Sequence, residues 1–208
     1  MKKIKTDYDS WANHYDNNFN PTRDLDKTAT IESLSNLDFC NVLELGCGSG
    51  KNTEWLIRKA EKLVGLDFSK NMLELADKKI TSKKVTFIKT DLNGKWPVKN
   101  NSFDLATINL TLEHIKNLDH IFNSVSMKLM KGGKCFVCEL HPKKQLLGSK
   151  AHFRNDKFEI VLDVFYHSEL EYIESAERAG LCLITKKDWV DNSRDVPRLI
   201  SFIFEKPK

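Results

Sequence analysis

The chain has 208 residues, of which 40% are hydrophobic and 30% are charged, with a formal net charge of +4. This length and composition indicate a single folded domain and exclude a disordered, collagen-like or repetitive chain. The small excess of basic residues is spread along the chain, which disfavours a dedicated nucleic-acid binder. Residues 1–5 are basic, but no apolar signal segment follows them and no run is long enough for a membrane span, so we expect a cytoplasmic protein.

The five cysteines give an odd count and favour reduced thiols. Cys135 and Cys138 form a CxxC pattern inside an apolar run that is typical of a strand. Residues i and i+3 of a strand point to opposite faces, so these two sulfurs should not meet. We therefore predict buried thiols and no metal site.

From residue 42 onward, short apolar runs alternate with segments of helical periodicity. Strands are predicted, in chain order, at residues 42–45, 63–66, 85–88, 103–110 and 135–140. Helices are predicted at residues 51–60, 69–80 and 114–130, with Ser69 as a cap and a Gly132-Gly133 turn before the fifth strand. This alternation predicts βαβ units and a mostly parallel sheet with helices on both faces.

The last part of the chain has a different pattern. Residues 167–179 are predicted to form a helix that ends at Gly180. Two strand-like runs, 181–190 and 199–205, then follow without a helix between them, and we expect them to pair antiparallel at the edge of the sheet. Aromatic residues of segment 1–40 lie on one face of a predicted helix, and residues 141–162 show no periodicity, so both segments are candidate lid or substrate elements.

The strongest functional signal follows the first predicted strand. Gly46, Gly48 and Gly50 stand at alternate positions before a helix, where the backbone can approach a ligand closely and free N–H groups are available. A dinucleotide site requires G-x-G-x-x-G, and its last glycine is missing here. Glu44, on the strand below the loop, would repel a pyrophosphate and suit a cationic ligand.

This E-x-G-x-G-x-G pattern resembles motif I of the class I S-adenosylmethionine-dependent methyltransferases, in particular bacterial enzymes that act on small molecules. The resemblance covers residues 40–140 well and the two ends more loosely. It implies an α/β fold with a seven-stranded sheet of order 3-2-1-4-5-7-6, in which the last strand is antiparallel. The single domain, 1–208, would comprise an N-terminal helical cap (1–40), a cofactor-binding core (41–140), a substrate-facing insertion (141–165) and a C-terminal helix with an antiparallel strand pair (166–208).

The resemblance also implies which residues bind the cofactor, S-adenosylmethionine, and its product, S-adenosylhomocysteine. Asp67 would accept hydrogen bonds from the ribose hydroxyls, and Asp91 would accept one from the adenine amino group. The other expected cofactor-binding residues are Tyr15, Glu44, Gly46, Cys47, Gly48, Gly50, Asn52, Phe68, Met72, Leu92, Asn109 and Leu110.

The expected reaction is methyl transfer to an O, N or C atom of a small-molecule acceptor by in-line displacement. The protein would mainly align the reacting atoms and exclude water, with a general base only for an acceptor that is protonated at working pH. The candidates for that base are His114, His141 and Tyr15. The cations and imidazoles of residues 139–154 favour an anionic acceptor.

Three alternatives remain at this point. One is an RNA- or protein-modifying methyltransferase of the same fold, and another is a cofactor-binding protein without catalysis. The third, a nicotinamide-dependent oxidoreductase, is disfavoured by the missing glycine. The sequence fits a monomer or a homodimer equally well.

Overall fold

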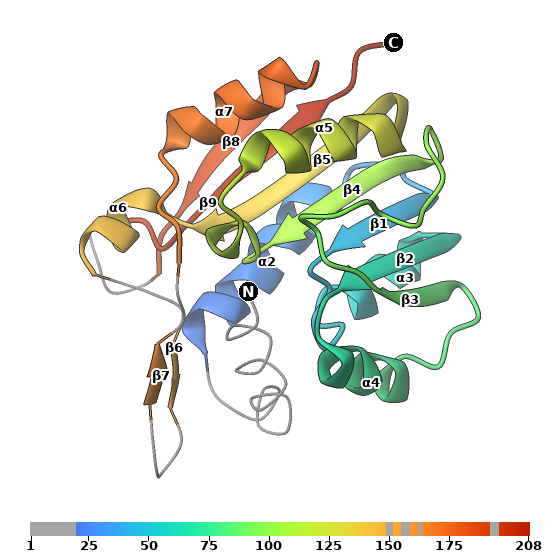
Figure 1. The fold of residues 1–208 in the computed structure, drawn as a ribbon, viewed down its shortest axis with the longest axis horizontal. Helices are drawn as coiled ribbons and strands as arrows, with labels where there is room; N and C mark the ends of the chain where they lie inside the picture. The colour runs from blue at the N-terminus through green and yellow to red at the C-terminus, as the bar shows by residue number, and fades with distance from the viewer. Residues whose placement is uncertain (1–19, 149–151, 155–158, 162–163, 192–195) are drawn as a thin grey trace.

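The computed structural model describes residues 20–148, 152–154, 159–161, 164–191 and 196–208. Its main feature is a seven-stranded sheet of order β3-β2-β1-β4-β5-β9-β8 (Figure 1). Strands β1 to β5 are parallel to one another, and β9 pairs antiparallel with both β5 and β8. Counted along the sheet's own strands, this is the predicted order 3-2-1-4-5-7-6, which is therefore confirmed.

The bounds of the sheet strands agree with the apolar runs of the sequence to within a few residues, except that the fifth strand begins earlier. They are β1 (Asn41–Leu45), β2 (Lys62–Asp67), β3 (Val85–Lys89), β4 (Phe103–Asn109), β5 (Leu129–Leu140), β8 (Cys182–Trp189) and β9 (Leu199–Glu205). A separate two-stranded hairpin is formed by β6 (His152–Arg154) and β7 (Glu159–Val161).

Helices cover both faces of the sheet. They are α2 (Pro21–Leu34), α3 (Thr53–Lys59), α4 (Lys70–Lys79), the 3₁₀ turn η1 (Leu112–His114), α5 (Leu118–Lys128), α6 (Pro142–Leu146) and α7 (Glu169–Arg178). In Figure 1, α5 and α7 lie in front of the sheet and α2 lies behind it. The predicted cap Ser69 begins α4, where its side chain accepts a hydrogen bond from the backbone N–H of Met72 at 3.2 Å.

The alternation of side chains along the buried strands divides the core into two parts. In β5, Cys135 packs into the cluster under α5 and α7, whereas Cys138 packs into the cluster with α2 and α3. The two thiols thus lie on opposite faces of the sheet, as their spacing predicts, and both are buried. Among the described residues no group of three or more metal-binding side chains occurs.

Two predicted elements differ from the structure. Residues 114–130 were expected to form one helix, but η1 ends at His114 and α5 begins only at Leu118, because the Asn117 side chain accepts a hydrogen bond from His120 N at 3.1 Å and caps a new helix. The fifth strand already begins at Leu129. The pairing register with β4 then jumps, so that Gly132 and Gly133 lie within an irregular stretch of β5 rather than before it.

The segment after β5 contains more structure than its sequence pattern suggested. It comprises α6 and the β6–β7 hairpin, and it leads back to η1 through a hydrogen bond from Phe165 N to Glu113 O at 2.7 Å. None of the helices in the described ranges is both long and apolar enough to cross a membrane.

Candidate cofactor cavity

A cavity of about 480 Å³ opens at the carboxyl ends of β1, β2, β3 and β4. This is the edge at which open α/β sheets bind ligands, and the volume falls within the range of small-molecule sites. Its wall is formed by the loops after these strands, by the start of α4 and by two residues of α2. The lining residues are Arg23, Asp26, Glu44, Leu45, Gly46, Cys47, Gly48, Ser49, Lys51, Asn52, Asp67, Phe68, Met72, Lys89, Thr90, Asp91, Leu92, Asn93, Asn109, Leu110, Thr111, His114 and Ile115.

The three glycines of the loop after β1 all have positive φ, but they serve different purposes. A Cβ at Gly46 would lie 2.1 Å from Oγ1 of Thr111, and one at Gly50 would lie 2.7 Å from Cδ1 of Ile80. These two glycines therefore allow the loop to pack against its neighbours, and Gly50 does not line the cavity. A Cβ at Gly48 would meet nothing within 4 Å, so Gly48 is the position where a ligand can approach the backbone.

Glu44 lies beneath this loop and is 4% exposed. Its carboxyl group accepts a hydrogen bond from the hydroxyl of Thr53. Burial, with repulsion from Asp26 and Asp67, raises the pKa of Glu44 to about 8. The sequence argument that Glu44 repels a pyrophosphate assumed a charged carboxylate. In the empty cavity at neutral pH, Glu44 is mostly protonated, so this argument holds only for a ligand that ionises it.

Asp67 ends β2 and holds the neighbouring loops together. Its Oδ2 accepts a hydrogen bond from Gly48 N at 2.9 Å, and its Oδ1 accepts one from Ser69 N at 2.8 Å. A carboxylate has about four acceptor positions, so both oxygens can still accept from a ligand. The structure thus joins the glycine loop and the start of α4 through one acid that lines the cavity.

Apolar and polar groups beyond Asp67 form a second part of the wall. Phe68 and Met72 line it from β2 and α4, and Leu92 lines it from the loop after β3. Asp91 closes a turn in that loop, where its Oδ1 accepts from Asn93 N at 2.9 Å. All four residues were predicted from the sequence to bind the cofactor, and all four border the same cavity.

Asn109 and Leu110, at the carboxyl end of β4, also line the cavity. Leu110 has φ of +48°, a left-handed backbone that is uncommon for a residue with a branched side chain. Asn109 Nδ2 donates to Oδ1 of Asp26 at 2.6 Å and to Oγ1 of Thr30 at 2.9 Å. These two bonds connect the predicted site residue to helix α2.

The loop after Leu110 is organised by an acid that the sequence analysis did not single out. Glu139 of β5 is fully buried, and its Oε1 accepts hydrogen bonds from Thr111 N and Leu112 N, both at 2.9 Å. Burial raises its pKa well above the ordinary value for glutamate. Glu139 thereby fixes the backbone that leads to η1.

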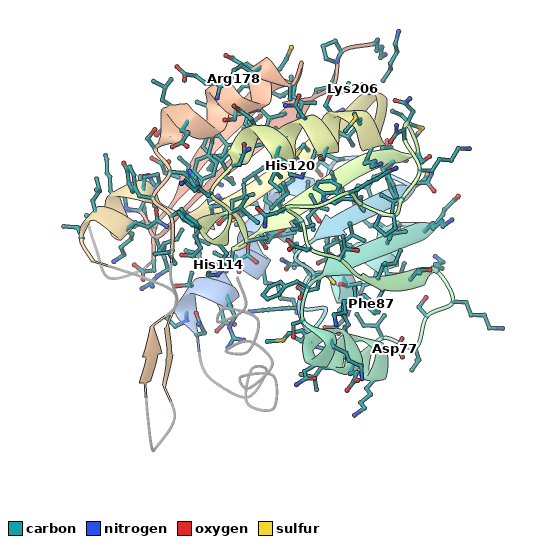
Figure 2. The ribbon with its side chains drawn as sticks, viewed as in Figure 1. Asp77, Phe87, His114, His120, Arg178 and Lys206 are labelled. Atoms are coloured by element: carbon teal, nitrogen blue, oxygen red, sulfur yellow. The ribbon has the colours of Figure 1, made fainter. Side chains whose placement is uncertain are left out.

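His114 is the candidate base that the structure brings into the cavity. It lines the wall from the end of η1 and is labelled in Figure 2 near the carboxyl ends of the strands. Its Nε2 lies 4.0 Å from Oε1 of Glu113. Glu113 is buried behind it, outside the cavity wall, and burial raises the pKa of Glu113 to about 7. The pair joins a cavity-lining imidazole to a carboxyl group that titrates near neutral pH.

The other two candidate bases are not among the cavity-lining residues. His141 is 2% exposed, its Nδ1 accepts from Lys143 N at 3.1 Å, and its Nε2 lies 3.5 Å from Oδ1 of Asp188. Both ring nitrogens thus face groups of the protein. Tyr15 lies outside the described residues. Of the cationic segment, Lys143 is exposed and Lys144 is buried, and neither lines the cavity.

Two charged residues of α2, Arg23 and Asp26, line the cavity but were missed by the sequence analysis. Their signal in the sequence is weak, because polar residues are frequent throughout segment 1–40. Lys51 was missed for a similar reason. Its Nζ pairs with Oδ1 of Asp24 at 2.8 Å, so that the loop after β1 and the first turn of α2 are connected at the cavity edge.

Comparison with known proteins agrees with this geometry. Residues 43–137 match a family described as a methyltransferase domain. A protein of Lactococcus lactis named demethylmenaquinone methyltransferase is 30% identical over 129 residues, which are 57% of this chain and 50% of that protein. A protein of the same name from Lactiplantibacillus plantarum is 33% identical over 119 residues, 53% of this chain and 47% of that protein. The chain thus spans about half the length of the curated relatives it matches.

Solved structures share the whole fold at low sequence identity. A Listeria monocytogenes protein described as an S-adenosylmethionine-dependent methyltransferase has a TM-score of 0.75 at 17% identity, covering 89% of this chain and 100% of that one. The N-methyltransferase NodS of Bradyrhizobium japonicum, solved in complex with S-adenosylhomocysteine, has a TM-score of 0.71 at 17% identity, covering 91% of this chain and 89% of that one.

Proposed function

Because the chain belongs to the class I S-adenosylmethionine-dependent methyltransferases, we propose that it transfers a methyl group to a nucleophilic atom of a small-molecule acceptor. The observation that carries this proposal is the open space at Gly48, inside a cavity that also contains the predicted residues of β2, β3 and β4. The curated relatives named demethylmenaquinone methyltransferase support a small-molecule acceptor.

The residues present fit S-adenosylmethionine. Phe68, Met72 and Leu92 provide apolar surface suited to a purine ring, and Asp67 keeps acceptor positions suited to ribose hydroxyls. The buried acids Glu44 and Asp26 suit the positively charged end of the molecule. When bound, S-adenosylmethionine supplies a methyl group on a positively charged sulfur, which an acceptor can displace in line.

The protein's own contribution is positioning and control of one proton. Glu139 and Asp67 fix the loops on the two sides of the cavity, so that acceptor and donor meet in one orientation and away from water. We assign the proton-accepting role to His114, because it lines the cavity whereas both nitrogens of His141 face protein groups. Glu113, behind His114, would stabilise the protonated imidazole.

The first experiment is calorimetric titration of the purified protein with S-adenosylmethionine, S-adenosylhomocysteine and NAD. We expect both sulfur nucleosides to bind and NAD not to bind. Binding of NAD alone would overturn the proposal.

A second experiment identifies the acceptor class. The protein is incubated with a methyl-labelled donor and a cell extract separated into small-molecule, RNA and protein fractions. We expect enzyme-dependent label in the small-molecule fraction. Label confined to RNA or protein would contradict a small-molecule acceptor while leaving methyl transfer intact.

A further inference from the structure

The inner wall of the cavity holds two buried carboxyl groups from different parts of the chain. Asp26 of α2 is 3% exposed and Glu44 of β1 is 4% exposed, and both line the cavity. Asp26 accepts hydrogen bonds from the side-chain amides of Asn52, at 2.9 Å, and Asn109, at 2.6 Å. Glu44 accepts from the hydroxyl of Thr53. All three of these donors are uncharged.

The cations around this pair do not neutralise it. No ion pair within 4.0 Å joins Asp26 or Glu44 to a described cation, and Lys51, the cation whose charge lowers the pKa of Asp26, is itself paired with Asp24. Arg23 also lines the cavity, 8% exposed. The other titratable groups that face the pair are listed here: Asp67 from β2, Cys47 from the glycine loop and Cys138 from β5.

Burying a carboxylate without a nearby cation is unfavourable, so such a group either holds a proton or faces a positive charge from elsewhere. Burial raises the pKa of both acids, and mutual repulsion raises that of Glu44 further. The empty cavity therefore favours a proton on this pair. Because the pair borders open space, a positively charged ligand can take the place of that proton.

We propose that Asp26, together with Glu44, is a specificity-determining residue that makes the cavity prefer the positively charged methyl donor over the uncharged-sulfur product. This inference rests on the proposed function. At neutral pH S-adenosylmethionine carries one more positive charge, on its sulfur, than S-adenosylhomocysteine. Binding of the donor displaces a proton from the pair into the solvent, whereas binding of the product displaces fewer. The preference for the donor therefore increases as the pH rises.

The test is calorimetric titration of the full chain with each ligand, in two buffers that differ in ionisation enthalpy, so that released protons are counted directly. For the wild type we expect the donor to release more protons than the product and to bind relatively more tightly at higher pH. In Asp26→Asn the difference in released protons should shrink, and the affinity ratio of donor to product should fall by about tenfold, as expected for the loss of one partly shielded charge contact.

Glu32→Gln is the matched control, because Glu32 lies on the exposed side of the same helix and pairs with Lys187 outside the cavity. It should leave both affinities and the proton count unchanged. Glu44→Gln should reproduce the effect of Asp26→Asn, and it serves as the test if Asp26→Asn does not fold.

Three outcomes would overturn the inference. The first is a wild type that binds both ligands with the same proton release. The second is a pair of variants, Asp26→Asn and Glu44→Gln, that weaken both ligands equally and keep their ratio, since Asp26 would then only position Asn52 and Asn109. The third is a wild type that binds neither ligand, which would overturn the proposed function as well.

Discussion

Two glycines of the same loop should respond differently to the same substitution. Alanine at either position adopts a left-handed backbone, which costs roughly 1–2 kcal/mol. At Gly46 the new Cβ would also lie 2.1 Å from Oγ1 of Thr111, whereas at Gly48 it would meet open space. We expect Gly46→Ala to lose clearly more stability in urea unfolding, and Gly48→Ala to lose mainly ligand affinity, by about tenfold or more as the Cβ obstructs the approach. Equal losses of stability in both variants would contradict this distinction.

Asp67 carries the second prediction at the scale of single residues. Hydrogen bonds to a charged group contribute roughly 1.5–3 kcal/mol each, so Asp67→Ala should weaken S-adenosylmethionine binding by about tenfold to a few hundredfold in calorimetry. Because Asp67 also accepts from Gly48 N and Ser69 N, the melting temperature should fall as well. Asp77→Ala, on the exposed side of α4 (Figure 2), is the control and should bind normally. Unchanged affinity in Asp67→Ala would remove Asp67 from the site.

The sequence predicted the part of the cavity that follows directly from strand ends. Asp67 and Asp91 each come after a short apolar run, and parallel strands bring such positions to one edge of the sheet. Asp26 and Arg23 could not be predicted in this way, because their place depends on how α2 packs across the sheet. His141 shows the opposite error, since a position next to the mouth does not determine where the ring nitrogens point.

At the scale of elements, Glu139 determines how the loop after β4 is held. Its raised pKa indicates a protonated side chain at neutral pH, which glutamine resembles. Glu139→Gln should therefore change the free energy of unfolding little. Glu139→Leu leaves two buried N–H groups, of Thr111 and Leu112, without an acceptor, at about 1–3 kcal/mol each. Urea unfolding of both variants tests this, and equal losses would show that the native side chain is ionised.

The elements that the sequence predicted well are those in which local preference and burial agree. The run 199–205 is such a case, because β9 is confirmed with the same bounds. The helix expected over 114–130 failed because the apolar periodicity continues through a break that only a cap reveals. Asn117 provides that cap, and it resembles an ordinary surface residue in the sequence.

At the scale of the whole molecule, buried acids make stability depend on pH. The folded pKa values of Glu44 and Glu113 are raised to about 8 and about 7, above the ordinary value of 4.5. The folded state thus binds protons more tightly than the unfolded state, and this contribution is full at low pH and lost as the pH rises through about 7 to 8. The free energy of unfolding of the ligand-free protein should fall between about pH 6 and about pH 9.

Glu44→Gln should show a smaller fall, because one of the two titrating groups is then absent. Urea unfolding at both pH values measures the difference directly. A wild type whose stability rises over this range would show that Glu44 and Glu113 are ionised in the folded protein.

The hydrogen bonds that Asp26 accepts from Asn52 and Asn109 have a practical consequence for shortened versions of this protein. A fragment that starts at Asn41 retains all strands of the main sheet, yet it lacks one side of its own ligand chamber. The smallest piece able to fold is therefore shorter than the smallest piece able to recognise its ligand, and anyone trimming or transplanting this domain should keep the helix that precedes the sheet.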